Sequence, residues 1–270
     1  MTSFDEDELG EAYVTGLEAE KRGDIASAAA AYRRCLEIDP ADHVGATIRL
    51  AGMGEGEAPA SAGHAYVATL FDQHAESFED ILVRQLRYGV PEQLADRLKS
   101  GGASYGHVLD LGCGTGLAGQ YLEAVADRLT GVDLSEEMIR ISGEKDIYDK
   151  LYVAEAVGFL QKHEEPPVYD LIVATDVLPY LGDLDPFFSS LAKRLSPGGL
   201  VGFSTETMDD AMLAGRAFAV GKAQRFHHGE AYVRDRLSVF GFSIEHFEAI
   251  TVRMQDGLPA PGHLVVARKG

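Results

Sequence analysis

The stretch His107-Val-Leu-Asp-Leu-Gly-Cys-Gly-Thr-Gly116 decides the fold predicted for this chain. An apolar run that favours a β-strand leads directly into a glycine-rich turn, and a helix is expected to begin near Leu117. Glycines allow the backbone to approach a ligand closely and to adopt torsion angles that are forbidden to other residues. The stretch therefore predicts a ligand site at the carboxyl end of this strand.

The glycine spacing alone leaves two classes of ligand open. Gly114, Gly116 and Gly119 also satisfy the dinucleotide fingerprint G-x-G-x-x-G. Asp110 at the strand end, together with Gly112, favours a different ligand, because a carboxylate there suits an ammonium group and would repel a pyrophosphate. The pattern predicts a ligand that is cationic near this turn.

Strands and helices alternate on the carboxyl side of this motif. Short leucine-rich or β-branched runs that favour strands occupy residues 107–111, 129–133, 151–154, 169–174 and 200–204. Helical stretches lie between them, which predicts parallel strands joined by crossover helices.

The last part of the chain has a different pattern. After a helix expected at 231–240, the strand-like runs 243–253 and 263–268 are joined by a turn that carries Asp256-Gly257, Pro259 and Pro261-Gly262. Two strand-like runs joined by such a turn are expected to form neighbouring antiparallel strands. We therefore predict an α/β fold with a doubly wound, seven-stranded sheet, in which five parallel strands are followed by an antiparallel C-terminal hairpin and preceded by a small all-α segment.

The ends of the second and third strands suggest a nucleoside. Asp133, in LTGVDLSEEM, is placed to accept hydrogen bonds from both ribose hydroxyls, and Leu134 and Met138 could line the sugar and base. Ala154 and Glu155 are placed to face an adenine edge. These residues alone do not separate S-adenosylmethionine from NAD, because both ligands carry a ribose.

The motif series DLGCGTG, GVDLS, VAEA, YDLIVATDVLPYL and LSPGGLVGFST, over about residues 105–205, resembles class I S-adenosylmethionine-dependent methyltransferases. Upstream, YVATLFDQHAESFE is similar to the pre-domain helix of small-molecule methyltransferases, in which an aromatic residue such as Tyr66, Phe71 or Phe78 closes over the cofactor. The resemblance implies S-adenosylmethionine as the cofactor. The predicted cofactor-binding residues are Asp110, Gly112, Cys113, Gly114, Thr115, Gly116, Asp133, Leu134, Met138, Ala154, Glu155, Asp176, Val177, Tyr66 and Phe71.

The resemblance implies in-line transfer of the sulfonium methyl group to a small or medium-sized acceptor, with release of S-adenosylhomocysteine. Such a reaction mainly needs the acceptor to be held in line and water to be excluded. A general base is needed only for a hydroxyl or an activated carbon acid. The candidates are His227, His228 and Asp176, with Glu206 and Tyr180 as further possibilities. A surface or helix-capping role for the two histidines stays open.

The acceptor site is expected in the segment 207–230, where a variable lid would sit. After the fourth strand the chain reads Thr175-Asp-Val-Leu-Pro-Tyr180, which lacks the Pro-Pro-aromatic pattern of amino-group methylation of nucleobases. This departure argues against DNA and leaves O-, N- and C-methylation of small molecules open. Two rival functions are a non-catalytic cofactor-binding protein that recruits a partner and an NAD-linked oxidoreductase.

The N-terminal part is predicted to form two helices within residues 9–42, separated by Gly23-Asp24 and ended by Asp39-Pro40. The stretch GLEAEKRGDIASAAAAYRRCLEIDP resembles one tetratricopeptide repeat, with matches at Gly16, Tyr32 and the closing proline. One repeat cannot bury its own face, so residues 9–53 are expected to pack against the next domain or to bind a protein partner.

Three units are thus predicted along the chain. Residues 1–53 form a tetratricopeptide-like helical hairpin, and residues 54–63 form a linker that is rich in Gly, Ala and Pro. Residues 64–270 form a class I methyltransferase domain, which includes a pre-domain helical segment at 64–99.

The amino-acid composition limits the binding partners and the location expected for this chain. The chain has 43 acidic and 24 basic residues and a net charge of −19, so a phosphate backbone would be repelled and nucleic acid is not an expected substrate. Cys35 and Cys113 show no metal-ligand spacing, and no metal site is expected. The acidic N-terminus does not resemble a signal sequence, and no run of 18 apolar residues occurs, which predicts a cytoplasmic protein without a membrane span.

Overall fold

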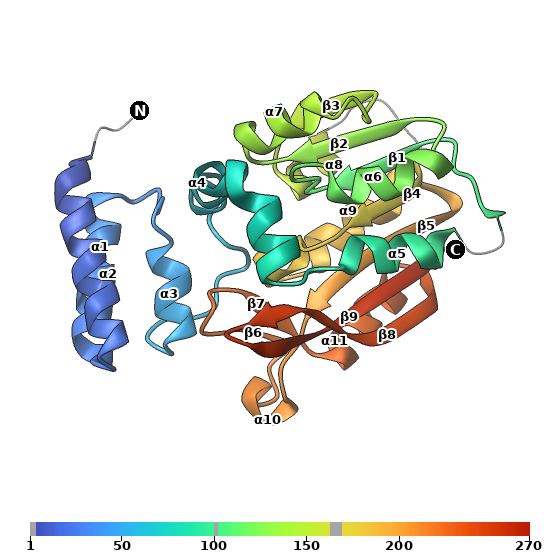
Figure 1. Cartoon of the computed structure of the whole chain (residues 1–270). Helices are drawn as coiled ribbons and strands as arrows, with labels where there is room; N and C mark the ends of the chain where they lie inside the picture. The colour runs from blue at the N-terminus through green and yellow to red at the C-terminus, as the bar shows by residue number, and fades with distance from the viewer. Residues whose placement is uncertain (1–3, 100–101, 163–168) are drawn as a thin grey trace.

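The computed structural model describes residues 4–99, 102–162 and 169–270. Its N-terminal part contains α1 (Glu6–Lys21), α2 (Ile25–Ile38) and α3 (Ala46–Gly52). Asp5 caps α1 by accepting the Glu8 N–H at 3.0 Å, and Asp24 caps α2 by accepting the Ser27 N–H at 3.1 Å. Figure 1 shows these helices at one side of the molecule. The two helices predicted around Gly23-Asp24 are therefore present.

The close packing of α1 on α2 depends on Gly16. A Cβ atom built on Gly16 would lie 2.6 Å from Cε1 of the fully buried Tyr32. We expect Gly16→Ala to lower the free energy of unfolding by about 1–3 kcal/mol, because the added methyl group overpacks this contact. Gly10→Ala on the same helix is the control, since nothing lies within 4 Å of that position. Urea denaturation that gives the same change for both variants would contradict this packing.

The main sheet has seven strands in the order β3-β2-β1-β4-β5-β9-β8. Strands β1 to β5 are parallel to one another, whereas β9 is antiparallel to both β5 and β8. This arrangement confirms the predicted doubly wound sheet with an antiparallel C-terminal hairpin. The strands are β1 (Val108–Leu111), β2 (Leu129–Asp133), β3 (Lys150–Val153), β4 (Tyr169–Ala174), β5 (Leu195–Glu206), β8 (Phe242–Gln255) and β9 (Leu258–Lys269).

Helices cover both faces of this sheet (Figure 1). On one face lie α5 (Val90–Leu98) and α6 (Leu117–Leu122), and on the other α8 (Ala156–Lys162), α9 (Asp185–Arg194) and α11 (Glu230–Val239). Neighbouring residues of β4 alternate between the two cores, with Val173 in the first and Ile172 in the second. The first face also carries α7 (Glu136–Glu144), which packs on β2 and β3.

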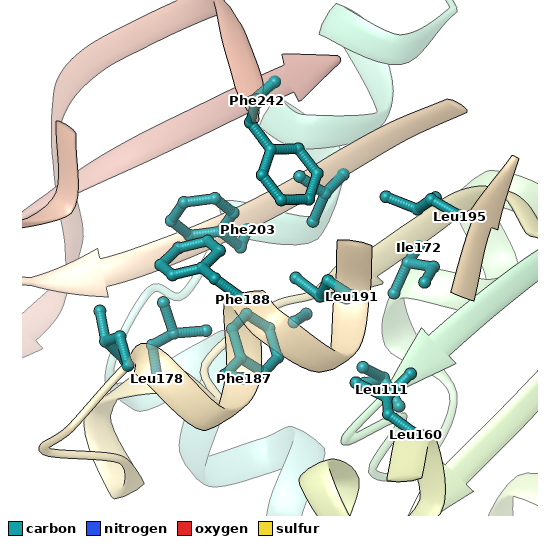
Figure 2. Packing of buried hydrophobic residues seen from close by; sticks show 14 of the residues in the cluster. Leu111, Leu160, Ile172, Leu178, Phe187, Phe188, Leu191, Leu195, Phe203 and Phe242 are labelled. Carbon is teal, nitrogen blue, oxygen red and sulfur yellow. The ribbon is translucent and has the colours of Figure 1, made fainter. Parts of the chain in front are cut away.

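The core under α9 is rich in phenylalanine. Phe187 and Phe188 of α9 are fully buried, and Figure 2 shows them beside Phe203 of β5 and Phe242 of β8. The ring centroids of Phe188 and Phe203 are 5.5 Å apart in an edge-to-face arrangement. This packing fixes α9 against β5 and β8.

The C-terminal hairpin differs from the predicted one. The sequence predicts a long turn up to Gly262, but the chain turns at Asp256-Gly257 alone, where φ is +50° and +78°. Two residues with positive φ match the tight turns that suit antiparallel strands. Pro259 and Pro261 therefore lie within β9. The prediction failed because it took prolines as turn residues, whereas here they occupy the part of β9 that extends beyond β5.

Two further segments were not anticipated in detail. Residues 207–230 contain α10 (Asp210–Leu213) and a small antiparallel pair, β6 (Phe218–Val220) and β7 (Phe226–His228). The pre-domain region 64–99 is divided into α4 (His64–His74), η1 (Ala75–Ser77), a π-helical turn η2 (Asp80–Gln85) and α5. The β6–β7 pair contacts α3 and so lies between the N-terminal helices and the main sheet.

Candidate functional site

A cavity of about 910 Å³, its mouth included, lies at the carboxyl ends of the parallel strands. The turn after β1 and the ends of β2, β3 and β4 form its floor, and residues of α4 and η2 line it from above. Open α/β sheets bind ligands at this edge. The predicted cofactor residues that line the cavity are Gly112, Cys113, Gly114, Asp133, Leu134, Ala154, Glu155, Asp176, Val177 and Phe71.

The glycine turn has the backbone shape that the sequence predicts. Gly112, Gly114 and Gly116 have φ angles of +64°, +53° and +89°, which side-chain-bearing residues rarely adopt. A Cβ atom on Gly112 would lie 2.4 Å from Cγ2 of Val177. Glycine at position 112 therefore lets Val177, just after β4, pack directly against the turn, and both residues line the cavity.

Asp133 at the end of β2 holds this turn in place. Its Oδ2 accepts the N–H of Gly114 at 2.8 Å, and its Oδ1 accepts the N–H of Ser135 at 2.9 Å. Burial raises the pKa of the Asp133 carboxyl, and these backbone donors oppose the shift. Each carboxylate oxygen still has a lone pair for a further donor.

Asp110 lies behind the turn and does not line the cavity. The Tyr148 hydroxyl donates to its Oδ2 at 2.7 Å, whereas its Oδ1 has no partner in the described part of the chain. Burial raises the pKa of Asp110 to about 7. A cationic ligand group in the cavity would favour the ionised form of this carboxyl.

Four other predicted cofactor residues also stay outside the cavity lining. Thr115 donates its hydroxyl to Oε1 of Glu79 at 2.7 Å, and Met138 of α7 is fully buried. Gly116 begins α6, and Tyr66 packs against Gly45 instead of reaching the cavity.

Glu155 lines the cavity, but its carboxylate is already engaged. Its two oxygens accept the N–H groups of Val157 at 2.8 Å and Gly158 at 2.5 Å, so the side chain caps the start of α8. Of the pair placed near adenine, Ala154 donates its N–H to the Asp133 carbonyl at 2.8 Å, and its own carbonyl accepts no backbone hydrogen bond from the described residues.

The segment above the cavity is attached to α7 by polar contacts that the sequence analysis missed. Ser135 donates to Asp72 at 2.5 Å, Arg140 pairs with Glu76 at 2.5 Å, and Lys145 pairs with Glu79 at 2.5 Å. These pairs join residues more than sixty positions apart, so spacing along the chain gives no sign of them.

Aromatic rings close the cavity on the same side. Phe71 lies with its ring centroid 5.9 Å from that of Phe78 and 5.4 Å from that of Tyr180, in edge-to-face contacts. The predicted aromatic cover is thus formed by Phe71 and Phe78, and Tyr66 belongs to a neighbouring cluster with Ile48 and Phe226.

The candidate bases are distributed unevenly around the cavity. Asp176 and Tyr180 line it, whereas Glu206 is buried beside them. His228 is fully buried, its Nε2–H donates to the Leu181 carbonyl at 2.8 Å, and its ring is stacked on Tyr232. Burial lowers the pKa of His228 to about 4, so the ring is neutral at pH 7.

His227 does not line the cavity either. Its Nδ1 lies 3.0 Å from the Arg225 carbonyl, and its Nε2 lies 3.6 Å from Oε2 of Glu206. The structure therefore does not bring the predicted histidine pair to the cavity. Sequence reasoning missed Arg225, whose guanidinium contacts Asp176, Tyr180 and Glu206 at once.

The order of the strands, the glycine turn and the acidic end of β2 together define the class I methyltransferase fold. Residues 109–201 match the family model described as a methyltransferase domain. None of the helices in the described ranges is long and apolar enough to cross a membrane.

Relatives and solved structures agree with this class. The chain is 28% identical over 161 residues to a ubiquinone biosynthesis O-methyltransferase of Bordetella pertussis, covering 57% of this chain and 63% of the relative. It is 31% identical over 102 residues to the protein of that name from Hydrogenovibrio crunogenus, covering 36% of this chain and 42% of the relative. The chain thus spans less than two thirds of either relative.

Among solved structures, a Leishmania major protein described as a SAM-dependent methyltransferase aligns with a TM-score of 0.60 at 16% identity, covering 76% of this chain and 82% of its own. The N-methyltransferase NodS of Bradyrhizobium japonicum, in complex with S-adenosylhomocysteine, aligns with a TM-score of 0.54 at 19% identity. The alignment covers 73% of this chain and 99% of NodS. These likenesses establish the fold.

Proposed function

We propose that this protein is an S-adenosylmethionine-dependent methyltransferase that acts on a small or medium-sized acceptor. The observation that carries the proposal is the joint placement of the glycine turn and Asp133 on the floor of one cavity, inside the region that matches a methyltransferase domain. The names of the relatives and of the structural neighbours support the same reaction and cofactor.

The residues present fit an adenosyl cofactor. Gly112 and Gly114, which line the cavity, would lie against the methionine part. Oδ1 of Asp110 behind the turn has no hydrogen-bond partner among the described residues, which favours a ligand that carries positive charge. Asp133 would accept hydrogen bonds from the ribose, and Leu134 and Ala154 would line the nucleoside. When bound, the cofactor supplies a sulfonium methyl group as the electrophile.

The chain's own part in the reaction is then to bind, to orient and to keep water out. Phe71, Phe78 and Tyr180 give the cavity an aromatic cover, which lowers access of water to the reacting groups. The net charge of −19 supports a small-molecule acceptor over a nucleic acid. A cytoplasmic location stays a prediction.

We also propose the three-part division of the chain, with residues 1–53 as a helical unit similar to one tetratricopeptide repeat. Two contacts support a packing role for this unit. A Cβ atom on Gly52 of α3 would lie 2.9 Å from the Gly221 carbonyl, and Phe226 of β7 packs with Ile48 of α3. The segment 54–63 would connect the unit to the domain, and Ala62 in it donates to the Tyr180 carbonyl at 2.8 Å. Binding of a protein partner through residues 9–53 stays a prediction.

Isothermal titration with S-adenosylmethionine, S-adenosylhomocysteine and NADH tests the proposed cofactor. We expect micromolar affinity for the two adenosyl ligands and no heat signal with NADH, because the carboxyl of Asp110 lies behind the glycine turn that a pyrophosphate would occupy and its Oδ1 has no partner among the described residues. Binding of NADH alone would overturn the proposal in favour of an oxidoreductase, and binding of none of the three ligands would overturn it altogether.

A further inference from the structure

A buried cluster of charges borders the cavity at the end of β4. It consists of Arg225, Arg253, Asp176 and Glu206, whose side chains are 8%, 6%, 15% and 2% exposed. These residues come from the β6–β7 turn, β8, the end of β4 and the end of β5, so four separate elements converge here. Only Asp176 among them lines the cavity.

Arg225 is the centre of this cluster. Its Nε donates to Oε1 of Glu206 at 2.8 Å, one terminal nitrogen donates to the Tyr180 hydroxyl at 2.8 Å, and the other donates to Oδ1 of Asp176. The guanidinium carbon lies 4.9 Å from the centre of the Tyr180 ring. The position of the two cavity-lining residues, Asp176 and Tyr180, is therefore set by one arginine.

Stability alone is a poor explanation for such a cluster. Taking two arginines and two carboxylates out of water is costly, and well-packed apolar residues usually serve the fold as well or better. Asp176 also has a φ of +64°, a left-handed conformation that costs a non-glycine residue about 1–2 kcal/mol. Strained backbone and buried charges that meet at a cavity are features of functional sites.

The hydrogen bonds made by Arg225 leave two groups available to a ligand. Oδ1 of Asp176 is occupied, but Oδ2 has no hydrogen-bond partner among the described residues. Tyr180 accepts from Arg225, so its own hydroxyl proton remains to be donated. Because both residues line the cavity, one acceptor and one donor are available to a ligand there.

We propose that Asp176 and Tyr180 bind a hydroxyl group of the methyl acceptor and that Arg225 is the positioning residue that holds them for it. A hydroxyl donates its proton to Asp176 and accepts the proton of Tyr180, so it satisfies both groups. A protonated amine only donates and would leave the Tyr180 proton without a partner. A neutral amine has a single lone pair, which cannot both accept the Tyr180 proton and attack the methyl group, whereas a hydroxyl oxygen has two. The inference rests on the proposed function, because it names the acceptor class of the same cavity.

The reaction that follows is balanced. The acceptor oxygen forms a bond to the methyl carbon of the cofactor as the carbon–sulfur bond breaks and its electron pair stays on sulfur. The hydroxyl proton passes to Oδ2 of Asp176, and from there to solvent after the products leave. The positive charge of the sulfonium and the negative charge of the carboxylate are both lost in this step, so no further reactant is required.

Matched pairs of model acceptors test the acceptor class. We would incubate the wild-type protein and S-adenosylmethionine with catechol and 1,2-diaminobenzene, with benzyl alcohol and benzylamine, and with further pairs of this kind, and measure S-adenosylhomocysteine. We expect product from hydroxyl compounds and none from their amine partners. Product from the amines alone, or none from the hydroxyl compounds although calorimetry shows bound cofactor, would overturn this inference. Absence of cofactor binding would instead overturn the proposed function.

Two variants test the roles of the residues with a hydroxyl acceptor that gives product. Tyr180→Phe keeps the ring against Arg225 and all buried charges, and we expect kcat to fall about 10-fold while the affinity for S-adenosylhomocysteine is kept. An unchanged kcat would exclude Tyr180 as a donor to the acceptor. This variant retains every ion pair of the cluster, so a folding defect is not expected to obscure the result.

Arg225→Lys keeps the charge but loses the three-way contact. Asp176 faces Arg225, Glu206 and Arg253; burial raises its pKa, and the arginines oppose the shift. Weakening the Arg225 contact should therefore raise the pKa of Asp176. In a plot of kcat against pH, the fall of kcat on the acid side (the acid limb) should then move to higher pH. Arg234→Lys, in an exposed pair with Glu230, is the control and should leave the limb in place. A lower kcat with an unmoved limb would reduce Arg225 to a structural role.

Discussion

Replacing Asp133 with alanine is expected to weaken the binding of S-adenosylhomocysteine by roughly 10- to 150-fold, equivalent to about 1.5–3 kcal/mol. Two effects add. The variant loses the carboxylate proposed to accept the ribose hydroxyls, and it releases the Gly114 N–H that the carboxylate now holds at 2.8 Å. The glycine turn would then be less well ordered for the methionine part of the ligand.

Two further variants separate these effects in the same titration. Asp133→Asn keeps one oxygen that can accept the Gly114 N–H, so its loss of affinity should be smaller than that of Asp133→Ala. Asp127→Ala changes an exposed carboxylate near the opposite end of β2 and should leave the affinity unchanged. If Asp133→Ala folds normally and binds as tightly as the wild type, the ribose does not lie at Asp133.

The floor of the cavity could be predicted from the sequence because it is built from local signals. A strand, a glycine turn and the start of a helix follow one another within residues 107–117, and Asp133 is the last residue of the next strand along the chain. Parallel strands bring their carboxyl ends to one edge of the sheet, so the placement of Asp133 beside Gly114 follows from order alone. No long-range contact has to be known in advance.

The histidine pair shows where that reasoning stops. His227 and His228 are consecutive residues of β7, and consecutive residues of a strand point to opposite faces. One of them therefore faces Glu206 and the other is buried against Tyr232. The strands β6 and β7 have only three residues each, which is too short for an alternating pattern to be visible in the sequence.

The arginines of the cluster were missed for a different reason. Arg225 is 49 positions from Asp176, and Arg253 is 47 positions from Glu206, so only the folded chain brings them together. Arginine is also mostly exposed in proteins, and composition alone gives no reason to place two of them in the interior. Their partners, Asp176 and Glu206, could be named as candidates because each ends a strand at the predicted ligand edge.

Replacing Glu206 with alanine is expected to lower the free energy of unfolding by about 3–5 kcal/mol. The side chain is 2% exposed and pairs with Arg225 at 2.8 Å and also with Arg253. Removing it leaves two guanidinium groups in the interior with one carboxylate, that of Asp176, between them. Urea denaturation at pH 7 measures the change.

A control variant and the pH dependence of unfolding test whether buried charge causes the stability loss of Glu206→Ala. Glu245→Ala removes a partner of Arg268 from a pair with 45% and 34% exposed side chains, and should cost less than about 1 kcal/mol. Burial alone would raise the pKa of the Glu206 carboxyl, but Arg225 and Arg253 outweigh this effect and hold the pKa below its usual value. Its contribution is therefore full above the pKa of the unfolded chain and is lost as the pH falls through the lower, folded value. The wild type should lose stability over this acid range more steeply than Glu206→Ala, and equal slopes for the two proteins would contradict the assignment.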